Sequence, residues 1–163
     1  MNKKLILIFI CFINLFCYSQ VIKAINKLDI EHKKCLDNVE NNMANCTFEF
    51  YTKMDDLLNI TYKKIKIQLS KNDQQKLKEL QILWLKKRDQ YFKKIAKETK
   101  EELDGDNTSQ DYRMICVHEN AIFVKDRILE LEKIYVKKLT RNQTKKKTNP
   151  LTARRSLWLQ DEQ

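Results

Sequence analysis

The chain has 163 residues, a formal net charge of +10, one glycine (Gly105) and one proline (Pro150). Turns in α/β and all-β proteins depend on glycine and proline, so their absence from residues 1–104 favours long helices with few connections. The same scarcity excludes the glycine-rich phosphate loops of nucleotide-binding proteins. A basic chain often binds nucleic acid, and whether this one does depends on where it resides.

The amino terminus has the pattern of a secretory signal peptide. Lys3 and Lys4 precede an apolar run over residues 5–16, and the small residue Ser19 follows shortly after it. The run is too short to span a membrane comfortably. We therefore expect a signal peptide over 1–19, cleavage near Ser19 and a secreted or periplasmic protein. Export argues against nucleic acid as the partner and favours anionic cell-surface polymers or a membrane surface.

Two amphipathic segments follow the leader. Residues 20–37 predict a short helical segment with Val21, Ile25 and Leu28 on one face. A long helix is expected over 39–69, where apolar residues recur in steps of three and four. This stripe consists of Val39, Met43, Cys46, Phe50, Met54, Leu57, Thr61, Ile65 and Leu69. Ser70 is placed to cap the next helix.

The second half of the chain predicts two more long helices. One covers 74–103, and its inward residues are Leu77, Leu80, Trp84, Phe92 and Ile95. After a polar loop over 104–109, the other covers 111–139, and its inward residues are Val117, Ala121, Val124, Ile128, Leu131 and Tyr135. Short connections make neighbouring helices antiparallel. The expected fold is all-α, an elongated bundle of three long antiparallel helices plus a short N-terminal helical segment. This domain covers 20–140, and a basic, flexible tail covers 141–163.

Polar residues form a matching pattern on the first two long helices. The first helix carries Asp55, Asn59 and Tyr62 on one face, and the second carries Gln81, Trp84 and Arg88. An antiparallel hairpin would pair Tyr62 with Gln81, Asn59 with Trp84 and Asp55 with Arg88, and Arg127 would join from the third helix. Buried polar groups need partners, so we interpret this set as a structural polar ladder.

Three cysteines remain after the leader: Cys35, Cys46 and Cys116. Exported cysteines are usually paired in disulfides. A spacing of eleven residues on one helix spans about 16 Å, too far for a disulfide. Either the chain folds back between Cys35 and Cys46, or one of them pairs elsewhere. Both Cys35–Cys46 and Cys46–Cys116 are feasible, and the first is preferred.

Carboxylates gather around the loop between the last two helices, which suggests a docking site for a cationic partner. They are Glu98, Glu101, Glu102, Asp104, Asp106 and Asp111. The loop lacks the glycine and glutamate of a calcium loop. His32 and His118 lack metal-ligand spacing, and no nucleophile motif is present. We therefore expect a protein that is not an enzyme and uses no metal or cofactor.

One ordered set of residues resembles the LprI-type lysozyme inhibitor family over about 35–135. It reads Cys35, Met43-x-x-Cys46, Asp55-x-x-Leu58-Asn59-x-x-Tyr62, Gln81-x-x-Trp84-x-x-x-Arg88-Asp89, Cys116 and Arg127-x-x-x-Leu131. The family usually has a cysteine where this chain has Phe92.

The resemblance implies an exported helical bundle that inhibits lysozyme. Such a protein would act by steric occlusion of the lysozyme cleft, and the acidic loop is the expected contact. The partner would be lysozyme or another envelope-associated protein. The alternative is a non-catalytic envelope binding or adaptor module, which the basic tail would hold to anionic cell-surface polymers.

Overall fold

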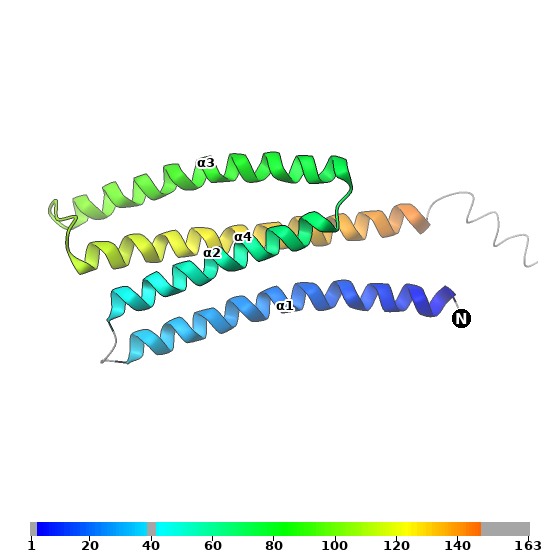
Figure 1. Cartoon of the computed structure of the whole chain (residues 1–163), viewed down its shortest axis with the longest axis horizontal. Helices are drawn as coiled ribbons and strands as arrows, with labels where there is room; N and C mark the ends of the chain where they lie inside the picture. Colours follow the sequence, from blue (N-terminus) through cyan, green and yellow to red (C-terminus); the bar gives the residue numbers. More distant parts are fainter. Residues whose placement is uncertain (1–2, 39–41, 148–163) are drawn as a thin grey trace, which may run out of the picture.

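The computed structural model describes the backbone of residues 3–38 and 42–147, and the side chains of 20–38 and 42–136. These residues form four helices and no strand (Figure 1): α1 (Lys3–Asp37), α2 (Met43–Ile67), α3 (Lys71–Glu102) and α4 (Gln110–Lys147). The expected all-α class is confirmed. The expected short N-terminal segment is instead the second half of α1, which has 35 residues. Residues 148–163 of the predicted tail lie outside the described residues.

Side-chain caps fix where the middle helices begin. The backbone N–H of Asn45 donates to Asn42 Oδ1 at 3.1 Å at the start of α2. At the start of α3, the N–H of Asp73 donates to Ser70 Oγ at 3.3 Å, so Ser70 is the cap that the sequence predicts. Each cap satisfies a backbone donor that the first helical turn leaves unpaired.

Successive helices run antiparallel, so α2 and α4 point in the same direction (Figure 1). Helix α4 packs on all three other helices, and its largest interface is with α2. Helices α2 and α3 are consecutive in the chain, yet they hardly contact each other. The predicted interlocked hairpin of these two helices is therefore wrong, because each of them packs on α4 instead.

The hydrophobic core follows the predicted stripes closely on α2 and α4. Met54, Val124 and Ile128 have no exposed surface, and Leu131 is 1% exposed. Val21 and Ile25 of α1 join the same core. Two predicted inward residues face solvent instead, since Met43 is 44% exposed and Leu80 is 47% exposed. Among the residues whose side chains are described, no helix is long and apolar enough to cross a membrane.

Candidate functional site

A buried arginine holds α3 against α4. Arg127, which is 4% exposed, donates its Nε and Nη2 hydrogens to Gln81 Oε1 at 3.1 and 3.0 Å. Its Nη1 donates to Glu130 Oε2 at 2.7 Å, and its guanidinium carbon lies 5.6 Å from the centre of the Trp84 ring. The contact combines hydrogen bonds with a cation–π interaction. Arg127, Gln81 and Trp84 therefore form a clamp between two helices.

The predicted rungs between α2 and α3 do not form. Arg88 donates from Nε and Nη2 to Asp89 Oδ1, on its own helix, at 3.0 and 2.8 Å. Asn59 Nδ2 donates to Asp55 Oδ2, one turn earlier on α2, at 3.1 Å. The pairing of Asp55 with Arg88 is wrong because α2 and α3 lie on α4 rather than on each other.

The remaining rungs are corrected in the same way. Gln81 accepts from Arg127 rather than meeting Tyr62, and the Trp84 ring lies against Arg127 and Phe123 rather than Asn59. Tyr62 instead lies under Lys66 of its own helix, at 5.9 Å. The predicted set thus divides into a clamp on α3 and α4 and a separate polar face on α2.

A disulfide joins the end of α1 to the start of α2. Cys35 and Cys46 are bonded, with their Cα atoms 5.7 Å apart, and Cys116 is a free, partly buried thiol. This is the first of the two predicted pairings. The chain reverses between the two helices, which brings together residues that one continuous helix would separate.

A stack of aromatic rings lies beneath the disulfide. The His32 ring lies over Phe50, with centroids 4.3 Å apart, and next to His118 of α4 at 5.8 Å. Burial lowers the pKa of His32, the nearby His118 lowers it further, and the Cys46 backbone and Asp29 offset part of this. Sequence reasoning missed this packing, because two histidines 86 positions apart carry no local pattern.

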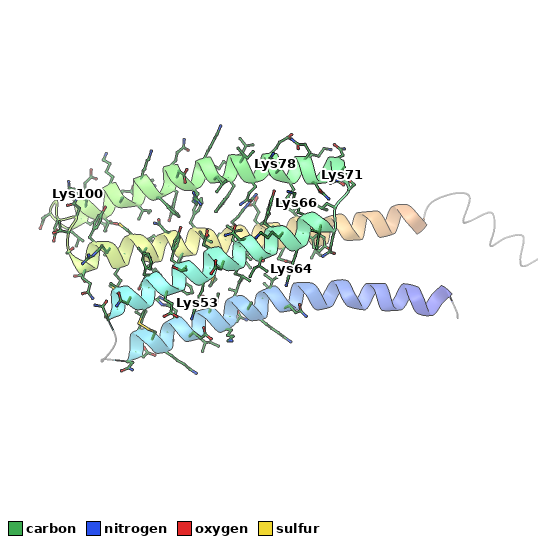
Figure 2. All side chains as sticks on the ribbon, viewed as in Figure 1. Lys53, Lys64, Lys66, Lys71, Lys78 and Lys100 are labelled. Carbon is green, nitrogen blue, oxygen red and sulfur yellow. A yellow bond between two sulfur atoms is a disulfide. The ribbon has the colours of Figure 1, made fainter. Side chains whose placement is uncertain are left out.

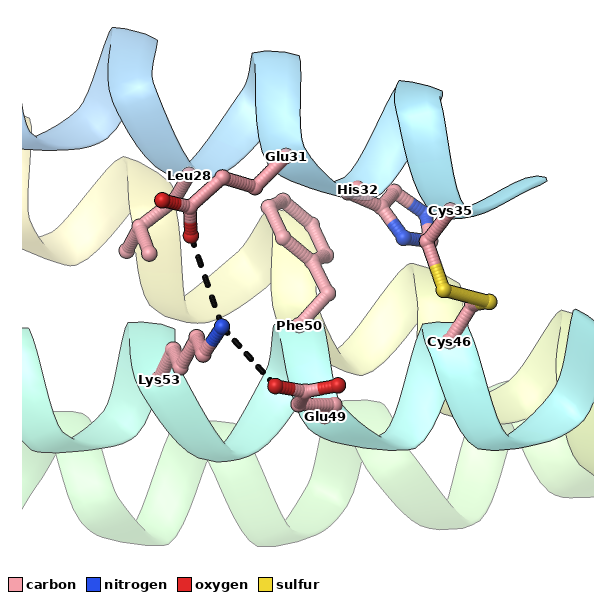
Figure 3. A pocket seen from close by; sticks show the side chains of 8 residues that line it. All are labelled: Leu28, Glu31, His32, Cys35, Cys46, Glu49, Phe50 and Lys53. Atoms are coloured by element: carbon pink, nitrogen blue, oxygen red, sulfur yellow. Dashed lines mark hydrogen bonds and ion pairs between the residues drawn. A yellow bond between two sulfur atoms is a disulfide. The ribbon is translucent and has the colours of Figure 1, made fainter. Parts of the chain in front are cut away.

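The cavity beside this stack is too small for a ligand. Eight residues line it, and Figure 3 shows the Phe50 ring between α1 and α2. Its volume of about 30 Å³ has room for a water molecule, whereas ligand sites measure roughly 300–1,000 Å³. No group of three or more potential metal ligands occurs among the described side chains.

Charged side chains tie α1 to its neighbours around this cavity. Lys53 Nζ lies 2.8 Å from Glu49 Oε1 and 3.4 Å from Glu31 Oε2 (Figure 3). Lys125 of α4 lies 2.7 Å from Asp29 Oδ2. A wider, open hollow of about 480 Å³ continues between α1 and α2. Its charged lining carries both signs, with Lys27 and Lys53 beside Glu31 and Asp56.

The acidic loop between α3 and α4 has a fixed backbone. The N–H of Gly105 donates to Lys100 O at 2.8 Å, and the N–H of Asp106 donates to Leu103 O at 3.0 Å. Gly105 has a φ of +90°, a conformation that suits glycine. On the other side, Ser109 Oγ accepts from the N–H of Tyr112 at 3.2 Å. Both ends of the loop are thus held by hydrogen bonds.

The Asp106 carboxylate accepts hydrogen bonds from its own loop. Its Oδ1 accepts from Thr108 N at 2.7 Å, from Thr108 Oγ1 at 2.9 Å and from Ser109 N at 3.2 Å. These hydrogen bonds, chiefly those from Thr108, lower the pKa of Asp106. The carboxylate therefore shapes the loop and stays ionised.

The six predicted docking carboxylates do not have equal freedom. Glu98 lies 3.6 Å from Lys94 Nζ, and Glu101 lies 3.7 Å from Lys97 Nζ. The other three are exposed and form no salt bridge within the described part of the chain: Glu102, Asp104 and Asp111. We call these three the free loop carboxylates.

A buried glutamate is the second feature that sequence reasoning missed. Glu132 is 2% exposed, and its Oε2 atom has no hydrogen-bond partner among the described residues. Burial raises its pKa, and the nearby Lys64 lowers it only in part. The sequence did hold a signal for this burial: Glu132 directly follows the core residue Leu131, and it lies two helical turns after Lys125 on the same side of α4.

The comparison with protein families gives one match. The family model described as "Lysozyme inhibitor LprI" matches residues 34–131, which is more than half of the chain. No curated protein and no solved structure matches. The matched segment runs from the disulfide through the clamp to Leu131, and it includes the acidic loop.

Proposed function

Because the chain belongs to the LprI family of lysozyme inhibitors, we propose that it inhibits lysozyme by placing the α3–α4 loop against the substrate cleft. The observation that carries this proposal is a stiff loop at one end of the bundle with three free loop carboxylates. A loop that is already ordered loses little entropy on binding. A blocking mechanism needs no catalytic group, in keeping with an inhibitor family.

Local charge supports the choice of this surface. Animal lysozymes are basic, and the whole chain carries +10, so overall charge opposes the encounter. Glu102, Asp104 and Asp111 supply negative charge at one end of the bundle, where it favours a basic partner. Asp106 and the paired Glu98 and Glu101 have a structural part in this proposal and are not contact residues.

Blocking of the cleft predicts competitive kinetics. Purified protein should raise the KM of a basic lysozyme for a soluble cell-wall substrate and leave kcat unchanged. The double variant Glu102→Gln/Asp104→Asn should weaken inhibition at least about fivefold, because two rim charges contribute about 1 kcal/mol or more together. The matched control is Glu79→Gln/Asp56→Asn, which removes the same two charges from exposed positions elsewhere.

The possible outcomes separate the activity from the surface. Equal inhibition by both double variants would reject the loop as the contact but keep lysozyme as the target. No inhibition of any lysozyme class by the unaltered protein would reject the function itself. Circular dichroism of each variant checks that the helices are intact.

We also propose that the protein acts outside the cytoplasm, after cleavage near Ser19. Lysozyme acts on the cell wall, so an inhibitor has to reach the same compartment, and the Cys35–Cys46 disulfide is typical of exported proteins. Mass spectrometry of exported material should give a chain that begins at Gln20. An uncut chain, or one with lipid on Cys17, would contradict this.

A further inference from the structure

Glu132 lies on a stripe of α4 that faces α1. His118, Lys125 and Glu132 are spaced by seven residues, or two helical turns, so their side chains leave α4 on the same side. The first two contact α1: the His118 and His32 ring centroids are 5.8 Å apart, and Lys125 Nζ lies 2.7 Å from Asp29 Oδ2. Glu132 therefore also faces α1, about 10 Å further along the helix than Lys125.

These two contacts show which part of α1 lies level with Glu132. Helices α1 and α4 run antiparallel (Figure 1), and both rise about 1.5 Å per residue. Counting on from the histidine pair places residue 18 opposite Glu132, and counting on from the salt bridge places residue 22 there. Glu132 is thus level with residues 18–22, which include the proposed cleavage site after Ser19.

Glu132 lacks a close partner in the uncleaved chain. Its side chain is 2% exposed, and its Oε2 atom accepts no hydrogen bond within the described residues. Lys64 of α2, which Figure 2 labels, acts on this carboxylate through its charge, but it is exposed and no salt bridge joins the two residues. A buried carboxylate without a paired cation is unfavourable, so a positive group at this level of α1 would be stabilised.

Cleavage after Ser19 creates such a group. In the uncleaved chain α1 runs without a break from Lys3 to Asp37, so the N–H groups of residues 20–23 donate to carbonyls one turn earlier. A chain that begins at Gln20 has a free α-ammonium group and unpaired N–H groups in its first turn. The helix dipole adds positive charge at the same end. The neighbouring Val21 belongs to the core, and its packing holds this end of α1 near α4.

We propose that removal of the signal peptide creates an ion pair between the α-ammonium group of Gln20 and the Glu132 carboxylate, which holds the start of mature α1 on α4. A signal peptidase adds water to the peptide bond after Ser19, so the leader leaves with the carboxylate and the mature chain keeps the amine. Cleavage also removes the part of α1 beyond this level, so the pair is open to water on one side and its effect is moderate. The inference rests on the proposed cleavage near Ser19 and is independent of lysozyme inhibition.

Cyclisation of Gln20 removes this charge selectively. In an N-terminal glutamine the α-amine attacks the side-chain amide, ammonia leaves and a neutral lactam results. The chain of residues 20–163, released from a fusion partner so that it begins at Gln20, is measured before and after treatment with glutaminyl cyclase. At about pH 6.5 the α-amino group is protonated, and the cyclised form should melt about 2–4 °C lower. Mass spectrometry confirms that each form is complete.

Glu132→Gln separates the ion pair from other effects of cyclisation. This variant keeps the shape of the side chain without its charge, so cyclisation should change its melting temperature by less than about 1 °C. Asp126→Asn is the matched control, because it removes an exposed carboxylate from α4 six positions earlier. Cyclisation of this control should have its full effect.

The α-amino group itself gives a second readout. Reductive methylation with ¹³C-formaldehyde labels the amine and keeps its charge. The N-terminal methyl resonance should titrate about one pH unit higher with Glu132 than with Glu132→Gln, because a nearby carboxylate favours the ammonium form. Lys64, the cation that faces Glu132 from α2, is unchanged in both proteins.

The outcomes divide between the ion pair and the cleavage site. Equal effects of cyclisation with and without the Glu132 carboxylate would reject the pair, as would equal titration of the α-amino group in the two proteins. An unchanged melting temperature of the unaltered chain on cyclisation would also reject it. Exported protein that begins more than one helical turn from residue 20 would instead reject the cleavage site and overturn the proposal, because its amine would not lie level with Glu132.

Discussion

Arg127 of α4 and Gln81 of α3 are joined by two hydrogen bonds from one guanidinium group to a single oxygen, at 3.1 and 3.0 Å. Because α3 hardly contacts α2, its other links to the bundle also lie on α4: the Tyr91 ring stacks on Phe123, and Tyr91 Oη donates to Glu119 Oε2 at 3.2 Å. The position of α3, and with it the acidic loop, therefore depends on its contacts with α4, of which this pair and the Trp84 ring beside it are one part.

Loss of this pair should be costly. Arg127→Met keeps the aliphatic stem but removes the buried charge, and we expect a loss of about 2–4 kcal/mol in the free energy of unfolding. Combined with Gln81→Leu, the loss should be about 1–2 kcal/mol smaller than the sum of the single losses, because the residues share bonds. Urea denaturation of the two single variants and the double variant measures this. Additive costs would mean that the two side chains do not interact.

Arg88 should behave in the opposite way. Its side chain is 27% exposed and is paired with Asp89, which is 59% exposed, on the same helix. Arg88→Ala should cost about 1 kcal/mol or less, and Asp55→Asn should add independently to it. A large coupling energy between these two changes in the same denaturation assay would support an interhelical pair instead.

The disulfide between Cys35 and Cys46 should stabilise the fold at the connection between α1 and α2. Cys35→Ser/Cys46→Ser should lower the free energy of unfolding by about 2–3 kcal/mol, since it frees a short loop in the unfolded chain. Cys116→Ser is the control and should cost about 1 kcal/mol or less, because that thiol is partly exposed and forms no disulfide. Peptide mapping without reductant should recover the Cys35–Cys46 linkage, and a linkage through Cys116 would contradict the structure.

His32 should make the fold sensitive to acid. Burial holds its pKa in the folded state below the ordinary value of 6.5, so the unfolded chain binds the proton more readily. The stability contribution is complete above pH 6.5 and falls as the pH drops through the lowered folded pKa. His32→Phe keeps the ring stack with Phe50 and should flatten this dependence. Unfolding measured from neutral to acidic pH tests it, and an unchanged slope would exclude His32 as the cause.

Glu132 should act with the opposite sign. Burial raises its pKa in the folded state above the ordinary value of 4.5, so folding favours the protonated carboxyl. Its contribution is complete below pH 4.5 and is lost as the pH rises through the raised pKa. Glu132→Met should therefore stabilise the uncleaved chain by about 1–2 kcal/mol at neutral pH. Thermal unfolding at neutral pH measures the gain, and a lower melting temperature would reveal an unrecognised favourable partner.

Periodicity predicted the faces of α2 and α4 well because apolar spacing directly reflects which side of a helix is buried. Phe50, Met54, Ile65, Val124 and Ile128 all lie in the core. The type of each element and the Ser70 cap could be read in the same way. Nothing in this spacing identifies which helix a face meets.

The polar ladder shows why pairing was harder to predict. A short connection between Ile67 and Lys71 requires only that the ends of α2 and α3 meet. Beyond that point α4 offers both helices a larger apolar surface, so Asp55 and Arg88 never pair. Leu80 is exposed for a related reason, since α3 buries a narrower stripe than its leucine content suggests.

The acidic loop illustrates a further limit of the sequence. Six carboxylates near one turn are visible from composition, but hydrogen bonding decides which of them are available. Asp106 accepts three hydrogen bonds from its own loop, and only the folded backbone reveals this.

The dominance of α4 in the core has a consequence for how the chain is made. Met54 and Phe50 of α2 share one core with residues about seventy positions later, such as Val124 and Ile128, and the largest interface of α2 is with α4. Until α4 leaves the ribosome, α1 and α2 can pack only on each other and α3 has almost no partner, and the long loop that must close slows folding. The nascent chain therefore lacks a complete tertiary structure through most of its synthesis. Late folding of this kind would keep the chain competent for export through a channel that accepts only unfolded polypeptide.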